Sequence, residues 1–214
     1  MLKLRQALGL RAYFSNFGWM ENIFTLRGKT IEKMDDDEFF HFCQENSSLK
    51  FERDSKGQII IMSPTAILSG DRNSEINFQL RAWNKKKKLG RIVDSDTGFY
   101  LKNKAMRNPD AAWISNEQFD KLSEKEIKKS FAYVCPDFIV ELKSYSDSIE
   151  TLKSKMIEWM ENGCRLGWLI DADSETVYIY EANKPERIHQ GFDLPLSGEP
   201  VLPGFELVLS ELRL

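Results

Sequence analysis

The first clear patterns of apolar and polar positions begin at about residue 31. In "TIEKMDDDEFFHFCQENSSL", aromatic residues follow three aspartates, which predicts a short helix whose first turn is favoured by Asp35 to Asp37 through the helix dipole. The next stretch, "KFERDSKGQIIIMSPT", carries a β-branched run after Ser55-Lys56-Gly57. It predicts a hairpin that turns at these residues and ends at Ser63-Pro64.

A longer helix is expected in "GDRNSEINFQLRAWNKKKKLG". Ile76, Leu80 and Trp83 recur there at helical spacing, while Asp71 is placed to cap the first turn and Gly90 to end the helix. Apolar residues also alternate between Ile76 and Leu80, so a strand stays open as the alternative. Two short strands follow in "RIVDSDTGFYL" and "PDAAWIS", and then a charged helix in "NEQFDKLSEKEIKKS".

The second half of the chain predicts a strand, a helix and a hairpin. Apolar residues dominate "CPDFIVELKS", and an apolar stripe at helical spacing follows in "SDSIETLKSKMIEWMENG". Asp147 and Glu150 resemble a capping box at the start of that helix, and Asn162-Gly163 is typical of its end. The apolar runs "RLGWLID" and "TVYIYE" predict a hairpin around Asp173-Ser174, before a tail with several Pro and Gly residues.

This order of elements indicates a mixed α/β (α+β) domain with a central mixed β-sheet flanked by helices. The chain has 214 residues, 42% hydrophobic and 12% aromatic, which is enough for one domain with a sizeable core. We expect this domain to span residues 31–214. Residues 1–30 show weak periodicity and are expected to form an N-terminal extension, a loosely docked arm.

The net charge of the chain does not indicate a polyanionic binding partner. The formal net charge is −3, so any contact with a polyanion must come from a local cluster of basic residues. Lys85 to Lys88 form the concentrated basic run of the sequence. They could contact phosphates, but a solvated helix end that complements the helix dipole is the commoner role of such a run, and both interpretations stay open.

Several classes of protein are excluded or disfavoured. The cysteines Cys43, Cys135 and Cys164 form no C-x-x-C pair, and His41 and His189 are isolated in the sequence, so no zinc site is expected. The sequence shows no Gly-rich phosphate loop and no Ser-His-Asp ordering, which argues against an NTPase or a serine hydrolase. It also has no signal-peptide pattern and no run of roughly 18 to 20 apolar residues. We therefore expect a cytoplasmic protein that does not enter a membrane.

The candidate chemistry lies in "CPDFIVELKS". Side chains alternate along a strand, so Asp137, Ile139, Glu141 and Lys143 share one face while the intervening residues face the core. A carboxylate and an ammonium at the end of an apolar strand form an ion pair, run into solvent, or belong to a site.

Asp110 is the best partner for Glu141 if the strand end is a metal site. Asp137 shares the face of Glu141, but four residues of strand separate their Cα atoms by roughly 13 Å. Asp110, in "NPDAAWIS", begins another apolar strand, and neighbouring strands are only about 4.8 Å apart. Mg²⁺ takes hard oxygen ligands and usually one or two protein carboxylates, so Asp110 with Glu141 predicts such a site. Asp137 is expected to cap the entry to its own strand.

Pro109-Asp110 followed by Glu141-Leu142-Lys143 and an amphipathic helix resembles the PD-(D/E)XK nuclease superfamily, and more specifically its Uma-two family of restriction endonucleases. The resemblance covers about residue 35 to the C-terminus. The matching segments are "IIIMSPT", "GDRNSEINFQLRAWN", "DTGFYL", "RNPDAAWIS", "CPDFIVELKSYSDS", "KMIEWMENGCRLGWLID" and "SGEPVLPGFELVLSEL".

The resemblance implies a restriction-endonuclease-like fold and a metal-dependent endonuclease that hydrolyses DNA phosphodiester bonds. By similarity, Asp110, Glu141 and the backbone carbonyl of Leu142 would bind Mg²⁺ or Mn²⁺. Lys143 would orient or help deprotonate the attacking water and offset charge on the phosphate. Glu75 matches the acidic residue that such folds bring to the site from a helix.

The departures from the family pattern keep some assignments open. Many members lack the strand lysine and use one from the following helix, so Lys155 is a second candidate beside Lys143, although most helix lysines are simply solvated. Arg72 and Arg107 lie near the acidic candidates in sequence and are candidate contacts to the substrate backbone. The loop Ser144-Tyr145-Ser146 differs from the Ser-Pro-Ser often found in the family.

One expectation about assembly and two alternative functions follow from the same residues. Cleavage of both strands of a duplex usually takes two active sites, so a homodimer is one expectation. A catalytically inactive nucleic-acid-binding or interaction protein of the same fold is the main alternative to an enzyme. A nuclease acting on RNA or on single-stranded ends is the other.

Overall fold

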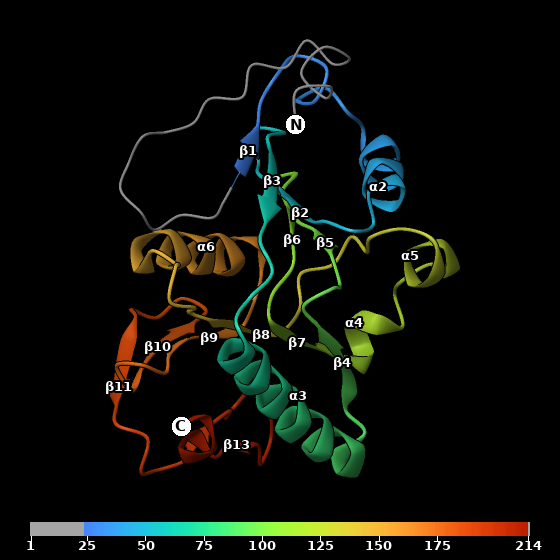
Figure 1. Ribbon diagram of the computed structural model, residues 1–214. Helices are drawn as coiled ribbons and strands as arrows, with labels where there is room; N and C mark the ends of the chain where they lie inside the picture. Colours follow the sequence, from blue (N-terminus) through green and yellow to red (C-terminus); the bar gives the residue numbers. More distant parts are fainter. Residues whose placement is uncertain (1–23, 214) are drawn as a thin grey trace.

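The computed structural model describes residues 24–213, which form a mixed α/β domain whose central sheet is flanked by helices (Figure 1). The strands are β1 (Phe24–Leu26), β2 (Lys50–Arg53), β3 (Ile59–Met62), β4 (Gly90–Asp94), β5 (Phe99–Tyr100), β6 (Met106–Arg107), β7 (Ala111–Ser115), β8 (Phe138–Leu142), β9 (Leu166–Asp171), β10 (Thr176–Glu181), β11 (Arg187–Gln190), β12 (Leu196–Ser197) and β13 (Glu206–Leu207). The helices are α2 (Asp36–Glu45), α3 (Ile67–Lys87), α4 (Asn116–Phe119), α5 (Glu124–Lys128), α6 (Ile149–Asn162) and the 3₁₀ helix η1 (Leu209–Leu212). The predicted fold class is confirmed.

The largest sheet has the strand order β11-β10-β9-β8-β7-β4, and we call it the large sheet. Its β8 and β9 are parallel and their neighbours are antiparallel, so the sheet is mixed as predicted. Helices α3 and α6 cover opposite faces of it. Val140 of β8 belongs to the core cluster of Leu80 on α3, whereas Ile139 belongs to the cluster of Met156 on α6.

A second sheet, the small sheet, has the strand order β1-β3-β2-β6-β5 and stands above the large sheet in Figure 1. It packs on α2 through its own apolar cluster, in which Phe39 of α2 meets Phe51 and Ile59 of the hairpin. From Arg107, the last residue of β6, only three residues lead to β7 of the large sheet. The chain segment around Asp110 therefore joins the two sheets.

The long helix α3 differs from its prediction at both ends. It begins at Ile67 rather than near Asp71, and the extended Ala66 before it makes no side-chain capping bond. At its other end Lys88 adopts the left-handed conformation, with φ 57°, and ends the helix before Gly90. Gly90 serves β4 instead, because a Cβ atom there would lie 2.1 Å from the carbonyl oxygen of Ile114 on the neighbouring strand.

Serine caps account for two further differences. The predicted charged helix after β7 is split into α4 and α5, because Ser115 and Ser123 each accept a capping hydrogen bond. Helix α6 is capped by Ser148, while Asp147 instead accepts hydrogen bonds from the backbone and hydroxyl of Ser144. Strand β11 was not expected from the sequence pattern.

The predicted extension covers residues that the structure describes only in part. Residues 1–23 lie outside the described residues. Residues 24–26 form β1, which pairs with β3 in the small sheet. Across residues 24–213, no helix combines the length and the apolar character needed to cross a membrane.

Candidate active site

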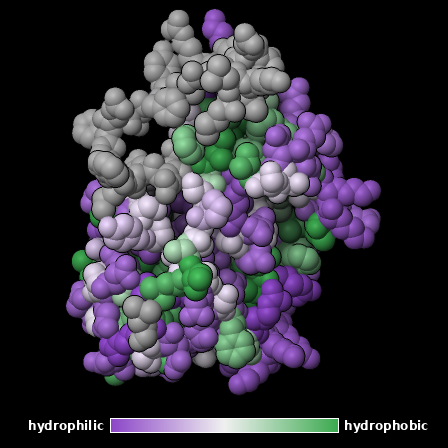
Figure 2. Space-filling view, in the orientation of Figure 1, coloured by the Kyte–Doolittle hydropathy of each residue, from purple (hydrophilic) through white to green (hydrophobic). Residues whose placement is uncertain are grey.

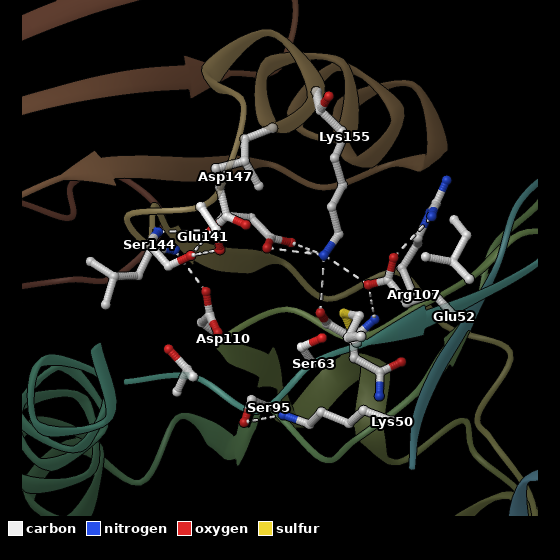
Figure 3. A pocket seen from close by; sticks show the side chains of 18 of the residues that line it. Lys50, Glu52, Ser63, Ser95, Arg107, Asp110, Glu141, Ser144, Asp147 and Lys155 are labelled. Atoms are coloured by element: carbon white, nitrogen blue, oxygen red, sulfur yellow. Dashed lines mark hydrogen bonds and ion pairs between the residues drawn. The ribbon is translucent and has the colours of Figure 1, made fainter. Parts of the chain in front are cut away.

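A cavity of about 670 Å³ lies where the small sheet, the large sheet, α3 and α6 meet (Figure 3). Its wall combines apolar and polar side chains, and the side chains that could do chemistry come from strands and helices far apart in the sequence. The charged and amide residues that line it are Lys50, Glu52, Asn73, Arg107, Asn108, Asp110, Glu141, Asp147, Lys155 and Glu158.

Asp110 and Glu141 meet in this cavity because their strands are neighbours. Strands β7 and β8 pair antiparallel with Ala111 opposite Val140, so the residues just beyond that pair, Asp110 and Glu141, lie side by side. The Asp110 Oδ2 atom accepts a hydrogen bond of 2.8 Å from the Leu142 backbone N–H, and Oδ1 accepts one of 3.1 Å from Asn73 Nδ2 on α3. Burial raises the pKa of Asp110, and these two hydrogen bonds oppose that effect.

Glu141 is held from the side of α6. Its carboxylate oxygens lie 2.9 and 3.0 Å from Lys155 Nζ, and Oε1 also accepts a 2.9 Å hydrogen bond from Trp159 Nε1. The residue is only 3% exposed, and this burial raises the pKa of its carboxyl group to about 7. Lys155 opposes the rise, while the negative charges of Asp110 and Glu52 add to it.

Lys155 is the cation at the centre of the cavity. Besides Glu141, its Nζ atom contacts Glu52 Oε1 at 2.8 Å and the carbonyl oxygen of Asn108 at 3.1 Å. Burial alone would lower the pKa of this ammonium, but Glu141 and Glu52 together raise it. Lys155 therefore stays protonated although its side chain is only 13% exposed.

Glu52 and Arg107 extend the network under the small sheet. Arg107 Nη1 lies 2.9 Å from Glu52 Oε2, and its Nε atom lies 2.6 Å from Glu158 Oε2 on α6. Although burial tends to raise the pKa of Glu52, Lys155 and Arg107 outweigh it and hold that pKa below its usual value. The network ties β2, β6 and α6 together around the cavity.

The residues present fit a divalent cation with few protein ligands. Across residues 24–213, no group of three or more His, Cys, Asp and Glu side chains is arranged to hold a metal. Mg²⁺ usually takes only one or two carboxylates and keeps several waters, and Asp110 with Glu141 supplies that number. Asn73 donates to Asp110 through its amide nitrogen, but its oxygen Oδ1 is buried and finds no hydrogen-bond partner among residues 24–213, and the same holds for Oδ1 of Asn108. Both residues line the cavity, so their oxygens suit a cation or its bound water.

Three of the predicted site residues lie away from the cavity. Lys143 Nζ lies 3.8 Å from Asp171 Oδ2, at the end of the neighbouring strand β9. Glu75 accepts a hydrogen bond from Gln79 one turn further along α3. Arg72 is buried, donates to the carbonyl of Leu212 and pairs with Asp173, so it anchors the C-terminal part of the chain.

The cavity contains the other predicted residues. Asp110, Glu141, Leu142, Arg107 and Lys155 all line it. The side chain of Lys155 is only 13% exposed, so the solvated position that is usual for a helix lysine is wrong for this residue. Outside the cavity, Asp137 accepts a 2.8 Å hydrogen bond from the Ser115 backbone N–H, at the entry of β8 as expected.

Glu52, Asn73, Glu158 and Trp159 were missed by the sequence reasoning. Glu52 lies in a four-residue strand with no unusual pattern, and its partner Arg107 is 55 residues away. Glu158 carried a weak signal, because it stands one turn after Lys155 on the same face of α6. Trp159 belongs to the apolar stripe of this helix and is buried, but nothing in the sequence showed that its ring N–H donates to Glu141.

Comparison with known proteins points to one family. A family model described as "Uma2: Putative restriction endonuclease" matches residues 36–210. A search of curated proteins finds no match. A solved structure described as a putative nuclease belonging to DUF820, from Anabaena variabilis ATCC 29413, is similar with a TM-score of 0.65 and 17% sequence identity, covering 76% of this chain and 88% of that chain. At this identity the likeness shows a shared fold. The family match spans most of the chain, and the chain therefore belongs to the Uma2 family of putative restriction endonucleases.

Proposed function

We propose that this protein is a divalent-metal-dependent endonuclease that hydrolyses phosphodiester bonds of DNA. One observation carries the proposal: Asp110 and Glu141 converge in one cavity beside the buried ammonium of Lys155. Two carboxylates and one fixed cation are the groups that metal-assisted phosphodiester hydrolysis needs. The family description and the likeness to a nuclease fold support the same reading.

Asp110, Glu141 and the carbonyl oxygen of Leu142 would hold the cation, which would supply Lewis acidity and lower the pKa of a bound water. Hydrogen bonds hold the two carboxylates in position. The Leu142 N–H orients the Asp110 carboxylate, and Trp159 orients that of Glu141. Neither carboxylate has to be ordered when substrate enters, which is an advantage for catalysis.

Lys155 takes the role that the strand motif suggested for Lys143. Its ammonium is held by Glu141, Glu52 and the Asn108 carbonyl, so it can stabilise negative charge that develops on a phosphate in the cavity. Lys143 is engaged with Asp171 outside the cavity. We therefore assign the catalytic lysine to α6 and give no catalytic role to Lys143 or Glu75.

The main alternative is a protein of this fold that binds nucleic acid without cutting it. Buried carboxylates and ammonium groups are costly to keep unless they are paired or used. The network around Lys155 pairs most of them, so stability alone could retain Glu52 and Arg107. The Oδ1 atoms of Asn73 and Asn108, which line the cavity and have no hydrogen-bond partner among residues 24–213, lie outside that network and would suit a bound cation, which supports a metal-dependent site.

Cleavage of supercoiled plasmid and of linear DNA, with Mg²⁺, Mn²⁺ or a chelator, tests the proposal. We expect metal-dependent cleavage by the wild type and its loss in Asp110→Asn, Glu141→Gln and Lys155→Met. Lys143→Met and Glu75→Gln are matched controls of the same types and should keep activity. Cleavage that survives in both carboxylate variants would remove the site assignment, and absence of cleavage with every metal would favour the non-catalytic alternative. RNA and single-stranded DNA in parallel reactions test the choice of substrate.

The proposed location of the protein is the cytoplasm. Cys43, Cys135 and Cys164 are all unpaired thiols, which supports a reducing compartment such as the cytoplasm.

Because one cavity serves one strand, cleavage of both strands would require a homodimer or two successive cuts. Accumulation of nicked plasmid before linear product would indicate successive cuts by single sites.

A further inference from the structure

Helix α3 presents a continuous exposed face to solvent. Its buried residues, among them Ile76, Leu80 and Trp83, pack against the large sheet. The opposite face follows an alternating spacing of four and three residues along the whole helix and its cap. The exposed residues on it are Ile67, Asp71, Ser74, Phe78, Arg81, Lys85 and Lys88.

Helix α3 connects the cavity at its first turns with the basic run at its last turn. The first turns of α3 line the cavity through Ser69 and Asn73, and Asn73 donates to Asp110. In Figure 1 the helix then runs away from β8 toward the lower edge of the molecule. With a rise of about 1.5 Å per residue, Lys85 lies about 18 Å from Asn73 along the helix and Lys88 about 22 Å.

The lysines at the far end are exposed and, across residues 24–213, make no ion pair with a carboxylate. Lys85, Lys86, Lys87 and Lys88 all share this property. Lysines near α5 differ, because Lys121, Lys125 and Lys128 each pair with an acidic residue. The C-terminal end of a helix carries only about half a negative charge, so four lysines exceed what the dipole of α3 requires.

The cavity itself is poorly equipped to attract a polyanion. Five carboxyl groups line it, against three basic side chains. Each of those cations is paired: Lys50 with Asp96, Arg107 with Glu52 and Glu158, and Lys155 with Glu52 and Glu141. Affinity for a phosphate backbone must therefore come from outside the cavity.

We propose that the lysine-rich end of α3 binds the sugar–phosphate backbone of a DNA duplex arm that flanks the bond to be cut. Lys85 and Lys88, which belong to the exposed face, and Lys86 at its edge would contact the phosphates, whereas Lys87 lies beside Gly204 of the C-terminal tail. This inference rests on the proposed function, since it takes the cavity as the place of cleavage. Phe78, which is 66% exposed midway between the cavity and the lysines, adds an apolar contact to the same face. At about 3.4 Å per base pair, the distance corresponds to an arm of about five or six base pairs.

The test compares a triple variant, Lys85→Gln with Lys86→Gln and Lys88→Gln, with a control triple variant, Lys121→Gln with Lys125→Gln and Lys128→Gln. Both remove three positive charges, but only the first removes unpaired ones. The probes are DNA duplexes with flanking arms of about four and about twelve base pairs, bound in Ca²⁺ over a range of salt concentrations. Thermal unfolding of each variant measures whether the substitutions change the fold.

We expect the wild type and the control to bind the long-arm duplex about tenfold more tightly than the short-arm duplex, and the α3 triple variant to lose this preference. The slope of log Kd against log salt should fall by about 0.9 for each phosphate contact removed, with an unchanged midpoint of unfolding. Equal arm preference in all three proteins would overturn the proposal. So would a loss of affinity that merely follows a lower midpoint of unfolding in the α3 variant, because that result would mark the lysines as helix stabilisers.

Cleavage of the same duplexes in Mg²⁺ separates this proposal from the proposed function. If all three proteins cut both duplexes with equal preference, the α3 surface is refuted while the nuclease stands. If no protein cuts but the long arm is still bound through the α3 lysines, the surface stands while the enzyme activity is refuted.

Discussion

Helices α6 and α3 cover opposite faces of the large sheet, and both carry lysines. Lys155 of α6 is buried in the cavity, whereas the lysines of α3 are exposed. Helix α6 passes over the face that carries Glu141, so its Lys155 turns inward and becomes the buried centre of a charge network. Helix α3 packs on the face of Val140 and Leu142, which is entirely apolar, so it buries Leu80 and Trp83, and the lysines of its last turn are exposed. The face of the strand under a helix thus decides whether a lysine serves chemistry or surface charge.

The largest expected effect comes from Lys155→Met, which removes the cation from the α6 side of this comparison. Glu52 and Glu141 would then be buried with one ammonium fewer between them, and breaking such a pair typically costs about 3–5 kcal/mol of unfolding free energy. Urea denaturation at pH 8 measures the loss, and DNA cleavage should disappear as well. Lys153→Met is the control, because Lys153 lies on the same helix and pairs with Glu186 at a more exposed position. Equal stability losses in both variants would contradict the central role of Lys155.

Glu141→Gln should change how stability depends on pH in metal-free protein. The carboxyl group has a folded-state pKa of about 7 against an ordinary value of 4.5, so between these values the folded protein holds a proton that the unfolded chain releases. The wild type therefore loses stability as the pH rises from about 4.5 to 7, and the loss is complete above pH 7. The glutamine variant lacks this loss, so its midpoint of unfolding should exceed that of the wild type at pH 8 and approach it at pH 5. Thermal unfolding in a chelator at both pH values measures this, and equal differences at the two values would contradict the raised pKa.

Trp159→Phe tests the hydrogen bond from α6 to Glu141 while leaving an aromatic ring in place. Trp159 Nε1 donates to Glu141 Oε1, and losing a buried hydrogen bond to a carboxylate typically costs about 1.5–3 kcal/mol. Trp168→Phe is a close control, because Trp168 is also fully buried but its ring nitrogen has no hydrogen-bond partner in the described part of the chain. We expect the Trp159 variant to be the less stable of the two in urea and to show a lower kcat for DNA cleavage. A Trp168 variant that lost as much activity would show that packing, not the hydrogen bond, matters.

The difference between a strand and the helix that packs on it explains which parts of the site could be predicted from the sequence. Strand alternation and strand spacing are local rules, so they placed Glu141 on the polar face of β8 and singled out Asp110 rather than Asp137 as its neighbour. Helix packing is not local: whether Lys155 or Lys143 reaches the cavity depends on how α6 crosses β8, and the spacing of the motif does not contain that information.

The residues that the sequence did not predict also depend on non-local contacts. Glu52 and Arg107 meet because β2 and β6, which are far apart in the sequence, pair antiparallel in the small sheet with Arg53 opposite Met106. The start of α3 escaped prediction for another reason, since Ala66 offers no capping side chain that a sequence pattern could reveal. Periodicity therefore predicts faces, while contacts between layers require the tertiary structure.

Lys143→Met should have the smallest effect. It is also the most direct test of whether motif spacing or helix packing identifies the catalytic lysine. The strand motif makes Lys143 the expected catalytic lysine, whereas in the structure its Nζ atom lies 3.8 Å from Asp171 and outside the cavity. A weak ion pair at that distance contributes about 1 kcal/mol or less, so unfolding in urea should change little and DNA cleavage should stay within about twofold of the wild type. A loss of activity comparable to that of Lys155→Met, without a loss of stability, would return the catalytic role to the strand. It would also mean that the ammonium swings from Asp171 into the cavity when substrate binds, so that motif spacing would outweigh packing in assigning the site.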